Sequence, residues 1–166
     1  MVRPVESRTM EFENDSFHIL FDVQYKKIVF TILNKMEDGI RINWDEVSFS
    51  LNGRAKRTVH KETGEYKIRD VQPPTTIPPK SSLKDFLIPT DIIRYGRIGY
   101  SNYTIIGNIL PLEASGKTQQ RDVIRKYKGT KITVFLPFYI AGKYVTRYYD
   151  LMINDVTVSK TKQKPR

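Results

Sequence analysis

Histidines and carboxylates are the residues of this chain that could support catalysis or metal binding. The two histidines, His18 and His60, lie far apart, and neither has a second ligand at the spacing of a metal site. Five carboxylates lie on or beside strand-like segments, and a glycosidase would need two of them across a cleft: Asp45, Glu46, Asp85, Asp91 and Asp150. Adjacent Asp45 and Glu46 face opposite sides of a regular strand and so could not act together.

Three familiar chemistries lack their motifs. Residues 115–118, SGKT, would need a glycine at position 111 to form a phosphate-binding loop, and that position is Pro111. No G-x-S-x-G nucleophile elbow is present. The absence of cysteine excludes disulfides, thiolate metal sites and cysteine nucleophiles. We therefore predict that the protein is not an enzyme and uses no cofactor and no metal.

The segment YVTRYYD, residues 144–150, could instead support binding. Tyrosines beside an arginine can stack on bases or carbohydrate rings; alternatively, they cover the rim of the core on an amphipathic strand. Alternation predicts that Tyr144 and Tyr148 share one face and that Arg147 and Tyr149 share the other. Together with the cations of the C-terminal tail, the candidate partner or polyanion contacts are Tyr144, Arg147, Tyr148, Tyr149, Lys160, Lys162, Lys164 and Arg166.

The formal net charge is +10, with an isoelectric point near 9.7. The cations concentrate in residues 54–69, 117–131 and 159–166. Such an excess of positive charge favours binding to nucleic acid, anionic lipid or an acidic partner. It is also typical of solvated turns and a frayed tail. Because residues 159–166 hold no apolar side chain beyond Pro165, we expect this tail to be mobile.

The elements that must position these residues are predicted to be strands. A chain of 166 residues is long enough for one well-covered core. Strand-like segments occur at 17–22, 27–33, 40–51, 54–60, 82–88, 103–110, 131–140 and 144–153. Turns are expected at Asn52–Gly53, near Gly64 and at 141–143, and only residues 118–128 resemble a helix. The pattern predicts an all-β, two-sheet immunoglobulin-like sandwich with at most one short helix.

The predicted domain organisation is an N-terminal extension (1–16), one sandwich domain (17–158) and the basic tail (159–166). In residues 40–51 the apolar parity changes, which predicts a bulge or bend near Asp45–Glu46. The strongest core strand covers residues 131–140, with an unbroken apolar face. The residues predicted to be buried are Ile28, Phe30, Ile32, Trp44, Val134, Leu136 and Phe138.

Residues 71–83, VQPPTTIPPKSSL, contain four prolines. Proline lacks the N–H of a sheet ladder and keeps the preceding residue extended. We predict an ordered, extended edge strand or crossover over residues 72–79, short of ladder hydrogen bonds. A ligand for a proline-binding domain is disfavoured because Pro74 and Pro78 have the wrong spacing.

The order of three segments, "IVFTILNK", "GIRINWDEVSF" and "PPTTIPPKSSLKDFLIPTD", resembles immunoglobulin-like extracytoplasmic domains of bacterial envelope proteins and lipoproteins. It is also loosely similar to the sandwich of late-embryogenesis-abundant (WHy-type) domains, in which an asparagine closes the second strand. The resemblance covers residues 17–153, and its motifs are structural. No lipidation cysteine is present.

The resemblance implies a non-catalytic binding or scaffold module of the bacterial cell envelope that acts through protein–protein contacts. The alternative is a basic β-domain that binds nucleic acid or another polyanion. The resemblance implies an unknown protein partner in the envelope, no specific nucleic acid, and membrane association only through a removed or missing N-terminal anchor. We expect an extracytoplasmic location after signal removal, or a cytoplasmic one if Met1 is the native start.

Overall fold

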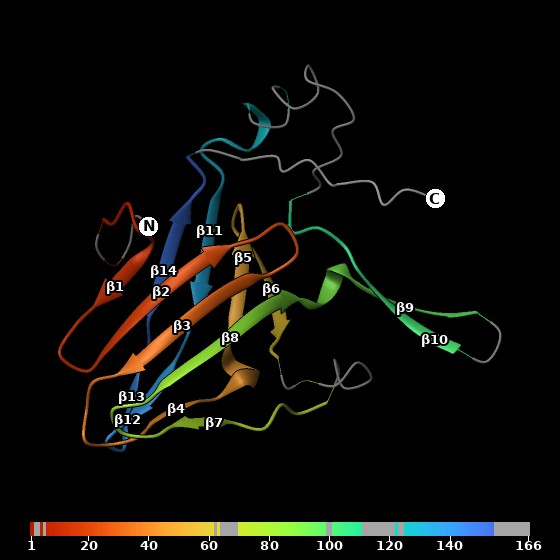
Figure 1. The fold of residues 1–166 in the computed structure, drawn as a ribbon. Helices are drawn as coiled ribbons and strands as arrows, with labels where there is room; N and C mark the ends of the chain where they lie inside the picture. Colours follow the sequence, from red (N-terminus) through yellow and green to blue (C-terminus); the bar gives the residue numbers. More distant parts are fainter. Residues whose placement is uncertain are drawn as a thin grey trace, which may run out of the picture.

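The computed structural model describes residues 1, 4, 6–61, 63, 70–98, 101–110, 122 and 125–154. These residues form two main antiparallel sheets and a separate two-stranded ribbon (Figure 1). The protein is an all-β, sandwich-like fold with nearly no helix, as predicted.

The larger sheet has eight strands. Their spatial order is β1 (Glu11–Glu13), β2 (Phe17–Val23), β3 (Ile28–Asn34), β8 (Ser82–Pro89), β6 (Arg54–Val59), β5 (Ser48–Leu51), β11 (Lys131–Phe135) and β14 (Tyr148–Met152). Strand β1 lies in the segment predicted to be an N-terminal extension, and Met1 is buried in the core. The sandwich therefore begins before residue 17.

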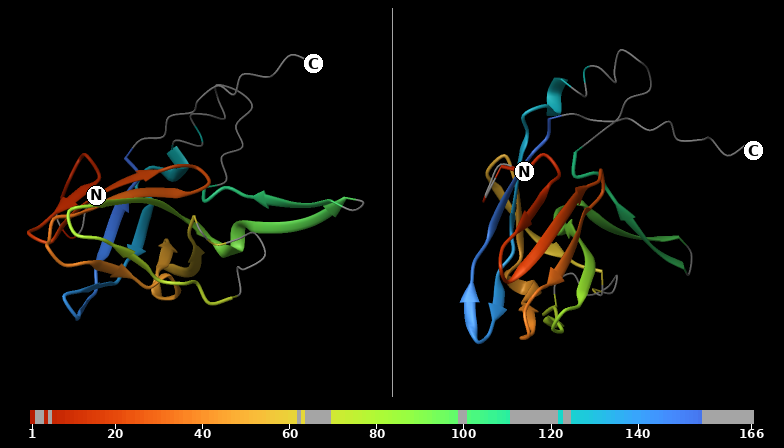
Figure 2. Two further views of the ribbon diagram at one scale, coloured as in Figure 1. Left: turned by 60° about the horizontal axis from the view of Figure 1, so that its bottom comes forward. Right: turned by 60° about the vertical axis from the view of Figure 1, so that its left-hand side comes forward.

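The smaller sheet has four strands, in the order β13 (Lys143–Val145), β12 (Phe138–Ile140), β4 (Ile40–Ile42) and β7 (Thr75–Ile77). The ribbon of β9 (Ile93–Ile98) and β10 (Ser101–Ile106) projects away from both sheets (Figures 1 and 2). Strand β9 was not predicted, because Gly96 and two arginines interrupt its apolar pattern.

Helical structure is limited to single turns among the described residues. Short 3-10 helices occur at η1 (Trp44–Glu46) and η2 (Thr90–Ile92). Residues 122 and 125–127 are helical and residue 128 lies in a turn, whereas residues 118–121, 123 and 124 of the predicted helix lie outside the described residues, as does the turn near Gly64. None of the described helices is long and apolar enough to cross a membrane.

The chain passes repeatedly from one sheet to the other, and two of these crossings lie in segments that were predicted to be continuous strands. Residues 40–51 cross through η1, which confirms the predicted bend at Asp45–Glu46 and moves the apolar residues to the opposite parity. The predicted single strand 131–140 is instead two strands, β11 and β12, separated by Leu136 and Pro137. Strands that switch sheets in this way form the corners of a sandwich.

The core lies between the two sheets and contains all seven of the residues predicted to be buried. Phe17 of the larger sheet packs on Phe138 of the smaller one, with ring centroids 4.9 Å apart. The ring of Tyr149, on β14, packs against Phe12 and Phe21, so the two ends of the eight-stranded sheet approach each other. Burial of this continuous apolar surface is the main stabilising contribution to such a fold.

The proline stretch forms the outer edge of the smaller sheet. Strand β7 pairs with β4 on one side only, which confirms the predicted edge position, although its three residues do share a ladder with β4. The buried amide of Asn34 holds this edge in place. Its Nδ2 lies 3.2 Å from the carbonyl of Ile77 and 3.0 Å from that of Pro78, and its Oδ1 accepts the N–H of Met36.

Both predicted short turns are present. Asn52 and Gly53 join β5 to β6, and Ala141 and Gly142 join β12 to β13. All four residues have positive φ, between 48° and 80°. This is the pattern of two-residue type I′ hairpin turns, whose twist matches that of the flanking strands.

Candidate binding surface

The outward face of the four-stranded sheet carries one residue from each strand in a single row. The register aligns Tyr144 with Tyr139, Tyr139 with Arg41, and Arg41 with Thr76. All four are exposed, while the neighbours of Tyr139 and Arg41 along their strands point into the core. Alternation along the strands therefore places this row on the solvent side.

The hairpin geometry brings the two tyrosines of the row together. In a two-residue hairpin the residues flanking the turn, Ile140 and Lys143, form a hydrogen-bonded pair. The next pair, Tyr139 and Tyr144, is then of the non-hydrogen-bonded kind, in which side chains lie closer. Their ring centroids are 5.0 Å apart and tilted by 50°.

A carboxylate fixes the orientation of Tyr144. Its hydroxyl donates to Glu46 Oε2 at 2.8 Å, and Glu46 Oε1 accepts a hydrogen bond of 2.7 Å from the side chain of Asn43. Hydrogen bonding to the Glu46 carboxylate, with a smaller effect of burial, raises the pKa of Tyr144 to about 12. The neighbouring Tyr139 and Tyr148 also raise this pKa, which places Tyr148 near the same group.

Exposed aromatic surface continues from the row onto the larger sheet. Tyr148 is the first residue of β14, and its ring packs on Phe135 of β11 at 4.7 Å. Tyr139 is 37% exposed, and Tyr144 and Tyr148 are each 49% exposed. We refer to Tyr139, Tyr144 and Tyr148 as the tyrosine surface.

Cations border the tyrosine surface. Arg41 lies beside Tyr139, and Lys143 precedes Tyr144 at the outer edge of the sheet, whereas Arg147 lies on the inner side near buried Tyr149. Within the described part of the chain, Arg147 Nε is buried without a hydrogen-bond partner. An unpaired buried donor of this kind is costly unless an acceptor is supplied.

The other candidate contacts have different positions. Tyr149 is fully buried, so its predicted role as an exposed contact is corrected to a core role; burial raises the pKa of its phenol. The reason is that β14 presents alternate residues to the core, and Tyr149 lies opposite Val134. Lys160, Lys162, Lys164 and Arg166 lie outside the described residues.

The structure also brings together a pair that the sequence did not reveal. His60 Nδ1 lies 3.1 Å from Asp85 Oδ2, and Asp85 Oδ1 accepts the N–H of Lys61 at 2.8 Å. The imidazole stacks on Trp44 with ring centroids 4.0 Å apart and only 8° between the planes. His60 directly follows β6, and Asp85 lies 25 positions further along the chain on the neighbouring strand β8, so no local spacing could have indicated the pair.

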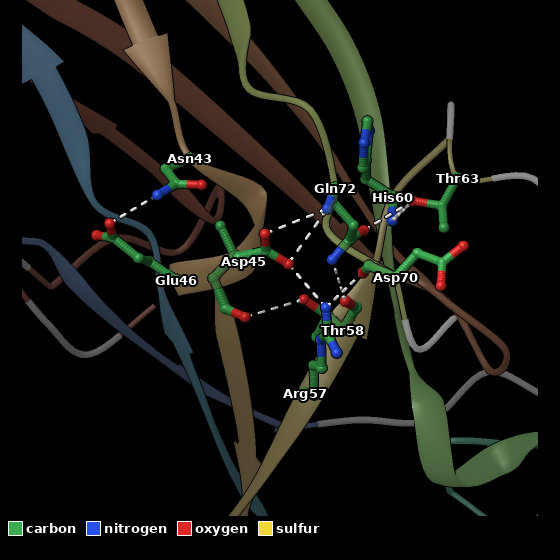
Figure 3. Close-up of polar contacts among 10 residues, drawn as sticks. Asn43, Asp45, Glu46, Arg57, Thr58, His60, Thr63, Asp70 and Gln72 are labelled. Carbon is green, nitrogen blue, oxygen red and sulfur yellow. Dashed lines mark hydrogen bonds and ion pairs between the residues drawn. The ribbon is translucent and has the colours of Figure 1, made fainter. Parts of the chain in front are cut away.

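A histidine–aspartate pair is also part of catalytic triads, but here it is not accessible. His60 is 3% exposed and Asp85 is 4% exposed, and His60 Nε2 has no partner among the described residues. A polar network adjoins the pair (Figure 3). In it, the backbone N–H of His60 donates to the hydroxyl oxygen of Thr63. The Thr63 hydroxyl donates to the side-chain oxygen of Gln72, and Gln72 Nε2 donates to the backbone carbonyl of Thr58.

The same network joins this region to η1. The Gln72 N–H donates to both oxygens of Asp45, and Arg57 donates to Asp45 at 2.7 Å and to the carbonyl of Asp70 at 2.8 Å (Figure 3). Asp45 thus faces Gln72 and Arg57, whereas Glu46 faces Tyr144. These contacts agree with the prediction that the two carboxylates do not act together.

The remaining candidate carboxylates have structural partners. Asp91 pairs with Lys56, and Asp150 accepts from Thr133 and pairs with Lys131. In the described part of the chain, no group of three or more histidine or acidic side chains could hold a metal ion.

The fold and the candidate surface together define an all-β sandwich that exposes aromatic and cationic side chains. No family model matches the sequence, and no curated protein matches it significantly.

Proposed function

We propose that this protein is a non-catalytic binding module that acts through protein–protein contacts on the tyrosine surface. One observation carries the proposal: Tyr144, Tyr139 and Arg41 are held side by side on one sheet face, and exposed Tyr148 on the larger sheet continues the aromatic surface. Tyrosine and arginine are enriched at protein interfaces, where a large ring provides contact area at a low cost in conformational entropy.

The rigidity of the surface supports this proposal. The Tyr144 hydroxyl is already bound to Glu46, and Tyr148 packs on Phe135, so these rings lose little freedom when a partner docks. The buried His60 and Asp85 support a role without catalysis, since a substrate does not reach either side chain in this conformation.

Polyanion binding is the weaker candidate. Residues 54–61 begin one of the basic segments, but Lys56 pairs with Asp91 and Arg57 pairs with Asp45. These internal ion pairs reduce the positive potential that the sequence alone predicts for this segment.

We further propose that the module works in the bacterial cell envelope. The support is the resemblance of residues 17–153 to immunoglobulin-like envelope domains. Fractionation of the host cells, followed by immunoblotting, tests this location; recovery in the cytosolic fraction alone would contradict it.

Photo-crosslinking in host cells tests the binding function. Tyr139 is replaced by p-benzoylphenylalanine in one version of the full chain, and Tyr25 in the control version. Tyr25 suits this purpose because it is 55% exposed and lies in the β2–β3 turn, in a part of the chain separate from the tyrosine surface. We expect discrete protein adducts from position 139 only, reduced by the additional substitution Tyr144→Ser.

Two results would contradict the proposal. Equal adducts from positions 139 and 25 would mean that the tyrosine surface has no special affinity for proteins. Nuclease-sensitive adducts from position 139 would mean that the partner is a nucleic acid.

A further inference from the structure

The two outer edges of the four-stranded sheet differ. Strand β7 is bordered by Pro74 on one side and by Pro78 on the other, and prolines beside an edge strand prevent another strand from adding to it. Strand β13 has no proline within or beside it, and among the described residues it pairs with β12 alone. The β13 edge is therefore the one open to a further strand.

The hairpin register indicates which backbone groups this edge offers. Lys143 and Val145 belong to hydrogen-bonded pairs with β12, so their N–H and C=O groups point inward to the sheet. Tyr144 belongs to the intervening pair, so its N–H and C=O point outward. The residue whose ring lies on the tyrosine surface thus also supplies the free donor and acceptor of the edge.

The charge of the edge selects the kind of strand. Lys143 is exposed at the edge, and Arg41 is exposed on the same sheet face. Glu46, the acid that contacts this surface, already accepts hydrogen bonds from Tyr144 and Asn43. A lysine on an open edge disfavours neutral or basic strands, and it pairs well with an acidic one.

We infer that the partner contributes an extended, acidic polypeptide segment that adds to the β13 edge. Its backbone bonds to Tyr144, a carboxylate pairs with Lys143, and an apolar side chain packs on the Tyr144 ring. This mode is β-strand addition, in which main-chain hydrogen bonds give affinity and side-chain positions give specificity. The inference rests on the proposed function and names the partner's chemistry.

Selection from a random peptide library displayed on phage, with the full-length protein as bait, tests the inference. The selected peptides are expected to be enriched in Asp and Glu around an aromatic or β-branched residue. A synthetic peptide of the selected sequence is then titrated against variants by isothermal calorimetry, with oligothymidine as the competing polyanion.

The variants distinguish the contribution of the β13 edge to peptide affinity from that of the Tyr144 ring. Lys143→Glu should lower the affinity for the peptide by about tenfold or more, because the charge pairing is lost. Tyr144→Ser removes the ring, and Tyr144→Pro removes the ring and the outward N–H, so the proline variant should bind more weakly than the serine variant. Arg54→Glu is the matched control, because Arg54 is also an exposed strand cation that directly follows a type I′ turn.

A charge swap checks that Lys143 contacts the peptide. A peptide with one acidic residue changed to lysine should regain affinity for Lys143→Glu, a result that loss of folding cannot produce. Circular dichroism of each variant identifies any that fail to fold.

Three outcomes would overturn the inference: no acidic enrichment, equal losses for Lys143→Glu and Arg54→Glu, or displacement of the peptide by oligothymidine. The proposed function has a separate test. If position 139 still yields protein adducts while the acidic selection fails, the binding module stands and its partner has another chemistry.

Discussion

Tyr144 combines the properties on which the proposed surface depends. Its ring is exposed beside Tyr139, its hydroxyl is bound to Glu46, and its backbone faces the open edge of β13. A single side chain therefore joins the face of the small sheet to its edge. Its ionisation gives a direct measure of that arrangement.

The ionisation of Tyr144 should depend on Glu46. In the folded protein the pKa of Tyr144 is raised to about 12 from the ordinary 10.0, because its neutral hydroxyl donates to the Glu46 carboxylate. A raised folded pKa means that this stabilisation is complete below pH 10 and is lost as the pH rises from about 10 to 12. Tyrosine-ring carbon NMR should therefore show a lower Tyr144 pKa in Glu46→Gln. An unchanged value would show that the hydrogen bond is absent in solution.

Leu136 tests the core at the point where the chain changes sheets. It is fully buried between β11 and β12, so Leu136→Ala loses apolar contacts and leaves a cavity. The free energy of unfolding should fall by about 2–5 kcal/mol, measured by chemical denaturation. Leu20→Ala, at a half-exposed site on β2, is the control and should cost much less. A near-neutral Leu136→Ala would mean that the core is not packed as described.

Among the elements, the β12–β13 turn bears directly on the binding edge. Ala141 occupies the first central position of a type I′ turn with φ of 48°, a conformation that alanine adopts at a cost. Asparagine favours this position, so Ala141→Asn should raise the free energy of unfolding by up to about 1 kcal/mol. Thermal unfolding measures the change, and a lower melting temperature would contradict the type I′ assignment.

The proline-rich edge should resist proteolysis. Strand β7 is tied to β4, to the Asn34 amide and, through Thr75, to the indole N–H of Trp44 at 2.8 Å. Limited digestion with proteinase K should therefore leave residues 72–79 intact in the native protein. Early cleavage within them would show that this segment is a flexible linker and would reopen the question of a second domain.

For the whole molecule, the basic tail separates electrostatic from specific binding. Deletion of residues 159–166 removes four cations and lowers the formal net charge from +10 to +6. The fold should survive, and most of the affinity for a single-stranded oligonucleotide should disappear. Binding of the intact chain should itself vanish as salt rises through about 150 mM, because it depends on counterion release. Fluorescence titrations at two salt concentrations measure both effects; salt-resistant binding without the tail would favour the polyanion alternative.

The amino-acid sequence by itself determined the local features of this protein. Alternating apolar residues indicated most strands and the seven buried residues, because burial on one face imposes a period of two. The Asn52–Gly53 pair, whose residue types tolerate positive φ, indicated a hairpin turn. The change in parity of the apolar residues indicated the bend at η1. These properties depend only on neighbours along the chain.

Tertiary structure decided what the long-range pairings bring together. The row from Tyr144 to Thr76 combines residues from four strands, and the pair of His60 and Asp85 joins β8 to the residue that follows β6. The fate of Tyr149, buried beside Phe12 and Phe21, depended on how the large sheet curls. Strand order and curvature arise from packing of the whole core, which no local window of sequence contains.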